Sequence, residues 1–165
     1  MELLLRTIHG SRLYGLSHAN SDHDYFEVYG WKKFRGRQRI ADGDDRTRQS
    51  YDRFMRYCEK GVPQYLEAMF SHRADFDAFP FDRLTEYGVN YVNARDTYER
   101  TIKSFWLSGC ENNDFKKRRH SARLALNLTS IYHTGRFNPT LTFGERLLVE
   151  ARAQSTNPDD IPEVF

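Results

Sequence analysis

Residues 10–24 read GSRLYGLSHANSDHD, and this stretch decides the fold. Before it, residues 3–8 form a short apolar run of the length of a buried strand. The Gly10-Ser11 step then opens a segment compatible with a short helix. From Asp24 onward the residues are aromatic and β-branched, which is typical of a second strand. The pattern predicts a strand, a turn, a short helix and a second strand.

Two acidic residues give this stretch its chemistry. Asp22 and Asp24 are two positions apart, so on a strand they project from the same face and both carboxylates can bridge a pair of divalent cations. Upstream, Gly10 allows close approach of the backbone to a phosphate, and the Ser11 hydroxyl can bind terminal phosphate oxygens. An Asp-x-Asp pair alone also occurs on surface strand edges and Gly-Ser alone in turns, so the prediction depends on their combination, with ten residues between Ser11 and Asp22.

In this combination the chain resembles the DNA polymerase beta-like nucleotidyltransferase superfamily, whose signature is Gly-Ser, a spacer of about this length and Asp-x-Asp. The resemblance extends over residues 45–54 and 60–67, which look like the RNA-repair-associated polymerase-beta-like family of bacteria and phages. Val62 stands where that family usually has Asn in a Lys-Gly-Asn-Pro-like turn. The resemblance implies an α+β fold, with a small mixed β-sheet of polymerase-beta palm-like topology followed by a C-terminal helical region.

The superfamily implies a third carboxylate on the next long strand. Asp42, Asp44 and Asp45 are the candidates, and the match to the subgroup favours Asp45. Adjacent strand residues point to opposite faces, so Asp44 and Asp45 cannot both serve on a regular strand. Asp44 stays the alternative, because the end of a strand cannot be placed within two residues from sequence.

A second match lies in a late helix. Residues 116–124 resemble the family's Lys, His-x-x-Arg-Leu pattern, and His120 and Arg123 share one helical face. The resemblance implies that Lys117, His120 and Arg123 lie near the nucleotide. The alternative interpretation is a solvated basic helix start with a packed structural histidine. Glu67, inside an otherwise apolar helix, can cap the helix or pair with a buried arginine, and we expect the structural pairing.

The remaining elements follow from periodicity and from helix-breaking residues. We expect a third strand at residues 37–45 and then two helices at 50–70, separated by Gly61-Val62-Pro63. A turn at 75–80 would follow, and then three further helices at 81–109, 115–132 and 143–153. Residues 1–70 would form the catalytic core, and residues 71–165 a helical region packed on it as one compact unit.

Composition limits the class of protein. The chain has 165 residues, 25 basic and 23 acidic, which fits one globular domain and leaves the net charge uninformative about partners. Its 12 Phe, 10 Tyr and 2 Trp exclude fibrous and wholly disordered classes. Cys58 and Cys110 lie in no zinc or redox motif. No apolar run is long enough to span a bilayer and the N-terminal run is too short for a signal peptide, so we expect a cytoplasmic protein without a membrane partner.

The function that the resemblance implies is transfer of an NMP from an NTP to an acceptor hydroxyl. Two Mg²⁺ (or Mn²⁺) ions would be held by Asp22, Asp24 and Asp45. The nucleotide would be bound by residues of both matched segments, namely Gly10, Ser11, Arg12, Lys117, His120 and Arg123. The basic segment 116–119 favours an RNA 3′ end, tRNA-like, as the acceptor, and a protein hydroxyl is the competing acceptor. A non-catalytic module that binds nucleotide or nucleic acid is the alternative from another functional class.

Overall fold

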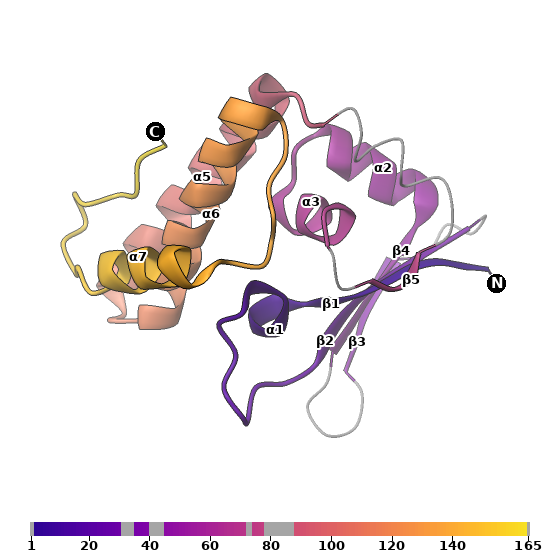
Figure 1. Cartoon of the computed structure of the whole chain (residues 1–165), viewed down its shortest axis with the longest axis horizontal. Helices are drawn as coiled ribbons and strands as arrows, with labels where there is room; N and C mark the ends of the chain where they lie inside the picture. Colours follow the sequence, from indigo (N-terminus) through magenta and orange to yellow (C-terminus); the bar gives the residue numbers. More distant parts are fainter. Residues whose placement is uncertain (1, 31–34, 40–44, 72–73, 78–87, 165) are drawn as a thin grey trace.

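The computed structural model describes residues 2–30, 35–39, 45–71, 74–77 and 88–164. Strands dominate the first half and helices the second, which gives the α+β architecture expected from the sequence (Figure 1). The elements in chain order are β1 (Leu3–His9), α1 (Gly10–Tyr14), β2 (Asp24–Tyr29), β3 (Arg35–Arg39), β4 (Asp45–Ser50), α2 (Tyr51–Glu59), α3 (Pro63–Met69), β5 (Ala74–Asp77), α5 (Tyr91–Glu111), α6 (Phe115–Thr134) and α7 (Phe143–Ala153).

The five-stranded sheet is mixed, with the strand order β3-β4-β2-β1-β5. β2 and β4 run parallel, and the other neighbouring pairs are antiparallel. Within this sheet His9 of β1 pairs with Asp24 of β2, which in turn pairs with Asp45 of β4. Directly paired residues project from the same face, so these three side chains form a row across the sheet. Phe26, two residues after Asp24, belongs to the hydrophobic core, so the row lies on the face that the helices cover.

The first strand, the short helix and the second strand lie where the sequence predicts them. The break at Gly61-Val62-Pro63 also separates two helices, because Gly61 has a φ of +68° and Pro63 begins α3. Helix α6 ends at Gly135, which adopts the left-handed conformation expected of a C-terminal glycine. The predicted final helix at 143–153 is confirmed as α7.

Three predicted segments are corrected. The expected strand at 37–45 is two strands, β3 and β4, which pair antiparallel with each other, and residues 40–44 lie outside the described part of the chain. The expected turn at 75–80 begins inside β5, because these residues pair with β1; residues 78–80 are outside the described ranges. In the described part of the expected helix at 81–109, residues 88–90 are not helical and α5 starts at Tyr91, where the Asn90 side chain accepts the N–H of Val92 as an N-cap; residues 81–87 are not described.

Two hydrophobic clusters hold the elements together. In the larger one, Phe26 of the sheet packs edge-on against Tyr65 of α3 at 5.3 Å between ring centroids. The same cluster includes buried residues of α5 and α6, among them Tyr98 and Leu124. The smaller cluster joins α1, through Leu13, to α6 and α7. The short helix α1 therefore lies where the sheet and the helices α6 and α7 meet (Figure 1). None of the helices in the described ranges has the length and apolar character needed to cross a membrane.

Candidate functional site

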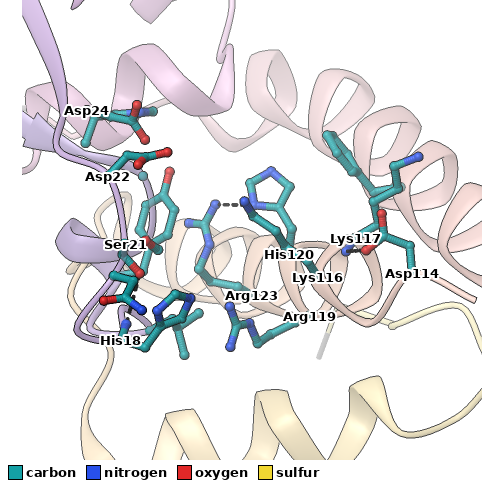
Figure 2. Close-up of a pocket in the computed structure, with 17 residues that line it drawn as sticks. His18, Ser21, Asp22, Asp24, Asp114, Lys116, Lys117, Arg119, His120 and Arg123 are labelled. Atoms are coloured by element: carbon teal, nitrogen blue, oxygen red, sulfur yellow. Dashed lines mark hydrogen bonds between the residues drawn. The ribbon is translucent and has the colours of Figure 1, made fainter. Parts of the chain in front are cut away.

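A pocket of about 570 Å³ opens at the junction of the sheet, α1 and the helices α5 and α6 (Figure 2). One wall comes from the sequence motif and includes Gly10, Ser11, Asp22 and Asp24. The opposite wall comes from the second half of the chain and is predominantly basic and aromatic. Its residues are Phe105, Asp114, Lys116, Lys117, Arg119, His120 and Arg123. The fold thus brings together two matched segments that are about a hundred positions apart in the sequence.

Gly10 is required at the acidic wall by its contact with Asp24. Its φ is +68°, and a Cβ atom built on it would lie 2.5 Å from Oδ2 of Asp24. Any side chain at this position would therefore strain the backbone and push the Asp24 carboxylate away. The glycine of the motif is therefore needed because it lets the aspartate of the same motif pack against the backbone.

Asp45 is placed beside Asp24 by the register of β2 and β4. The N–H of Asp45 also donates to the carbonyl of His23 at 3.3 Å, which fixes the backbone of β4 next to the acidic motif. Asp45 thus projects from the same sheet face as Asp24, whereas Asp44 lies outside the described residues. Among the residues that the structure describes, no three His, Cys, Asp or Glu side chains are gathered closely enough to hold a metal ion.

Arg12 lies behind the acidic wall and is not one of the described residues that line the pocket. Its Nε and Nη2 donate to the carbonyl of Ser21 at 3.1 and 2.6 Å, and Nε also donates to the carbonyl of Asp22 at 3.3 Å. Arg12 therefore holds the backbone of the loop that carries Asp22. Its predicted role in binding the nucleotide remains a prediction, and the hydrogen bonds of its guanidinium are to this loop.

The four basic residues 116–119 near the start of α6 lie in different surroundings. Lys117 lines the pocket while its Nζ donates to Ser108 at 2.8 Å. Arg118 is buried and donates to the carbonyls of Gly109 and Ala153, which makes it structural. Lys116 and Arg119 line the pocket, with Arg119 3.9 Å from Glu150.

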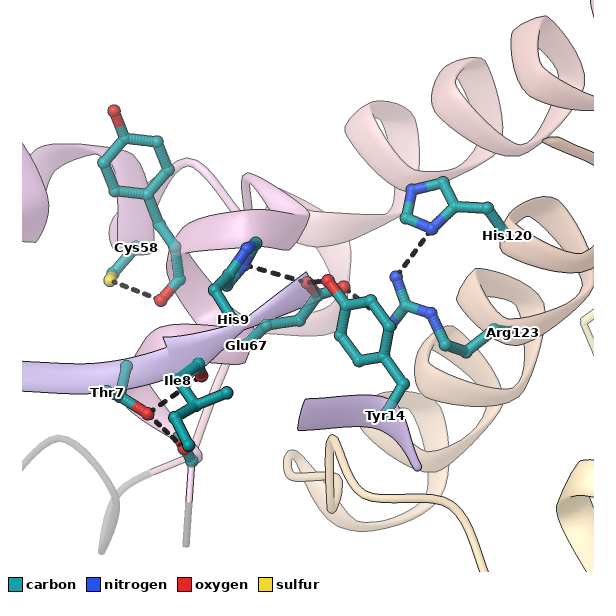
Figure 3. Close-up of polar contacts among 10 residues, drawn as sticks. Thr7, Ile8, His9, Tyr14, Cys58, Glu67, His120 and Arg123 are labelled. Carbon is teal, nitrogen blue, oxygen red and sulfur yellow. Dashed lines mark hydrogen bonds and ion pairs between the residues drawn. The ribbon is translucent and has the colours of Figure 1, made fainter. Parts of the chain in front are cut away.

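A buried polar network adjoins the pocket, and its members His9, Tyr14 and Arg123 also line the pocket (Figure 3). Its centre is Glu67 of α3, which accepts from Tyr14 at 2.5 Å and from Nη1 of Arg123 at 2.8 Å. Nε2 of His9 lies 3.3 Å from Oε2 of Glu67, the same oxygen that accepts from Tyr14. The guanidinium of Arg123 also stacks over the Tyr14 ring, 3.5 Å from its centroid. The expected pairing of Glu67 with a buried arginine is confirmed.

The charges in this network are compensated. Burial by itself would raise the pKa of Glu67, but Arg123 and His9 outweigh it and hold the pKa well below its usual range. Burial and the nearby Glu67 carboxylate raise the pKa of Tyr14 well above its usual range. Glu67 is therefore an ionised carboxylate in contact with a neutral phenol and a charged guanidinium.

Several lining residues were not predicted from the sequence. Tyr14 lies inside the motif without matching it, and Phe105 and Asp114 belong to segments where no motif was recognised. Asp114 was predictable as an N-cap, since an aspartate often precedes the first turn of a helix. In the structure its carboxylate accepts the N–H of Lys117 at 3.1 Å.

No family model matches the chain, and no curated protein matches its sequence.

Proposed function

We propose that the chain is a metal-dependent nucleotidyltransferase that transfers an NMP from an NTP to an acceptor hydroxyl. One observation carries the proposal: Asp22 and Asp24 line a pocket whose opposite wall is basic, and Asp45, which is not among the described lining residues, pairs with Asp24 on the neighbouring strand. Carboxylates on one side and cations on the other suit a metal-bound triphosphate, whose charge both walls stabilise.

The donor set fits a hard divalent cation. Asp22, Asp24 and Asp45 offer only carboxylate oxygens, which are the ligands that Mg²⁺ and Mn²⁺ prefer alongside water and phosphate. Asp22 and Asp24 would hold both ions, and Asp45 would complete the ligands of one. When bound, the ions would supply charge stabilisation at the transferring phosphorus and would lower the pKa of the acceptor hydroxyl. Asp45 would accept the proton of that hydroxyl.

The chain's own groups would orient the substrate. The hydroxyl of Ser11 and the backbone of Gly10 would hold the β- and γ-phosphates, which leave as pyrophosphate. Arg12 would keep Asp22 in place through the carbonyls of its loop. A palm-like topology would account for the parallel β2–β4 pair that brings Asp45 beside Asp24.

For the acceptor we propose an RNA 3′ end, as in RNA repair or modification within the cytoplasm. Lys116 and Arg119 lie at the pocket wall and can contact RNA phosphates. A protein hydroxyl as the acceptor is an outcome that the same experiment detects.

The proposal is tested by incubating the protein with each labelled NTP, Mg²⁺ or Mn²⁺, and either total tRNA or a protein extract. We expect labelled RNA. We also expect Asp24→Asn to lower the rate by about a thousand-fold or more, because the metal ions that Asp24 would hold stabilise the negative charge of the triphosphate both when it is bound and in the transition state. Asp52→Asn is the matched control, since Asp52 is an exposed carboxylate on α2. Label found only in protein would assign the other acceptor. Full activity of Asp24→Asn, or nucleotide binding without any pyrophosphate release, would overturn the enzymatic proposal.

A further inference from the structure

His120 lies on the pocket wall with its two ring nitrogens in different surroundings (Figures 2 and 3). Nδ1 is 2.9 Å from Nη2 of Arg123. Phe105 packs edge-on against the imidazole at 4.6 Å between ring centroids. Among the described residues, Nε2 of His120 has no hydrogen-bond partner.

The contact with Arg123 fixes which nitrogen carries the proton. A guanidinium has N–H donors and no acceptor, so Nδ1 of His120 must be the acceptor. In the neutral ring the proton then resides on Nε2. The imidazole therefore has one N–H donor, on the nitrogen that Arg123 does not contact.

The surroundings also keep this ring neutral. Burial and the Arg123 guanidinium lower the pKa of His120 to about 3, although Glu67 on α3 acts in the opposite direction. His9 on β1 and Lys116 on α6 add to the lowering. The Tyr14 ring of α1 is 6.4 Å away, and Phe105 of α5 contributes no charge.

Both terminal nitrogens of Arg123 have partners within the protein, whereas its buried Nε has no hydrogen-bond partner among the described residues. Nη1 donates to Glu67 at 2.8 Å, Nη2 donates to His120, and the guanidinium plane lies over the Tyr14 ring. Its side chain is 0% exposed. These contacts suit a group that orients His120 better than one that binds the substrate directly.

We propose that His120 donates an uncharged hydrogen bond from Nε2 to an oxygen of the β- or γ-phosphate of the bound NTP, and that Arg123 is the positioning residue that fixes this tautomer. This inference rests on the proposed function and names the part of the substrate that the α6 wall holds. Lys116 lies one helical turn before His120, and Arg119 also lines this wall, so the charge around the donor favours a polyanion. A neutral donor binds phosphate less strongly than a cation would, which suits a group that must release pyrophosphate.

Calorimetry with Mg²⁺ and a ligand series tests which group His120 contacts. The ligands are the four α,β-methylene NTP analogues, inorganic pyrophosphate and the four 5′-monophosphates. We expect His120→Asn, whose shorter side chain ends near the position of Nδ1, to weaken binding of the analogues and pyrophosphate about ten-fold. Binding of the monophosphates should be unchanged. His120→Gln, whose amide nitrogen reaches about as far as Nε2, should retain most of the affinity.

The outcomes separate this inference from the proposed function. An equal loss for the monophosphates, or no loss for pyrophosphate and the analogues, would overturn the role of His120 while the nucleotide site stands. No binding of any nucleotide by the unmodified protein would overturn the proposed function, and this inference with it.

The tautomer is tested without any ligand by nitrogen-15 NMR of the histidine rings. We expect His120 to be the Nε2–H tautomer and to stay neutral from pH 5 to pH 8. Arg123→Lys keeps a charge opposite Glu67 but cannot reach both partners with a fork, so it should give a mixture of tautomers. An Nδ1–H tautomer in the unmodified protein would overturn the positioning role, whether or not the variant folds.

Discussion

At the scale of single residues, the ion pair of Glu67 and Arg123 is unusual because both side chains are almost completely removed from water, at 1% and 0% exposure. Removing two charges from water is costly, and the cost is offset only when hydrogen bonds satisfy the charged groups. Tyr14 and His120 provide such bonds here. Losing one member would leave the other charge buried without compensation.

We therefore expect Glu67→Gln and Arg123→Met each to lower the free energy of unfolding by about 3 to 5 kcal/mol. Urea denaturation followed by circular dichroism measures this loss. The control is Arg95→Met, which breaks the exposed pair of Arg95 with Glu99 on α5 and should leave the midpoint nearly unchanged. A loss as small as the control's in either buried variant would show that the network does not stabilise the fold.

Gly10→Ala tests the contact between the glycine and the aspartate of the motif. The left-handed conformation alone costs about 1 to 2 kcal/mol for an L-residue, and the new Cβ would displace Asp24. We expect a lower melting temperature and loss of Mg²⁺-dependent transfer. Gly144→Ala in α7 is the control, because a Cβ there meets nothing within 4 Å and the helix should gain up to about 1 kcal/mol. Unchanged transfer by Gly10→Ala would show that Asp24 does not need this position.

Part of the site was predictable residue by residue. Gly10, Ser11, Asp22 and Asp24 lie close together in sequence, so their spacing carries the chemistry. The network centred on Glu67 was predictable only as a pairing with some arginine. Its actual partner is 56 positions away, and only the packing of α3 against the later helices determines it.

At the scale of elements, α6 serves the core and the pocket with different faces. Arg118 and Leu124 face inward, whereas Lys116, Arg119 and His120 line the pocket. Asp114 precedes the helix as its N-cap, and its carboxylate also adds a negative charge to the pocket.

Two substitutions of Asp114 separate its cap from its charge. Asp114→Ala removes both and should cost about 1 kcal/mol of stability. Asp114→Asn keeps the cap, so stability should be unchanged, while loss of the negative charge should tighten binding of an NTP analogue about two-fold. Thermal melts and calorimetry measure the two effects. Weaker binding by Asp114→Asn would indicate that the carboxylate itself contacts the ligand or its ions.

The helices were easier to predict than the strands for a physical reason. Gly61, Pro63 and Gly135 end or begin helices through their own backbone preferences, so local sequence suffices. β4, by contrast, reads Asp-Arg-Thr-Arg-Gln-Ser and has no apolar residue. It is a strand because its backbone pairs with β2 on one side and β3 on the other, and such pairing depends on distant segments.

At the scale of the whole molecule, the pocket lies where three parts of the chain converge. Tyr14 comes from α1, Glu67 from α3, and His120 and Arg123 from α6. The network that adjoins the pocket therefore connects the sheet-bearing half to the helical half. Protonation of this network should affect the stability of the entire fold.

The dependence of stability on pH follows from two pKa shifts of the same sign. The folded protein lowers the pKa of His120 from 6.5 to about 3, and it also lowers the pKa of Glu67 from 4.5. Below pH 6.5 the unfolded chain therefore binds a proton at His120 that the folded chain does not. Each such proton makes the free energy of unfolding fall by about 1.4 kcal/mol for each unit by which the pH is lowered. Below pH 4.5 Glu67 adds a second proton to the difference.

We expect the contribution of these two groups to the free energy of unfolding to be largest above pH 6.5. It should decline as the pH is lowered towards 4.5 and decline more steeply below pH 4.5. Urea denaturation at pH 7, 6, 5 and 4 measures this profile.

The variant His120→Gln tests the part of the profile that comes from His120, because glutamine does not titrate. Between pH 6.5 and 4.5 its free energy of unfolding should decline less steeply than that of the unmodified protein, by about the slope that one proton contributes, whatever the variant's stability at pH 7. The matched control is His133→Gln, whose ring is exposed near the end of α6. The same slope in the unmodified protein and in His120→Gln would mean that His120 binds its proton equally in the folded and unfolded chains, contrary to a ring kept neutral beside Arg123.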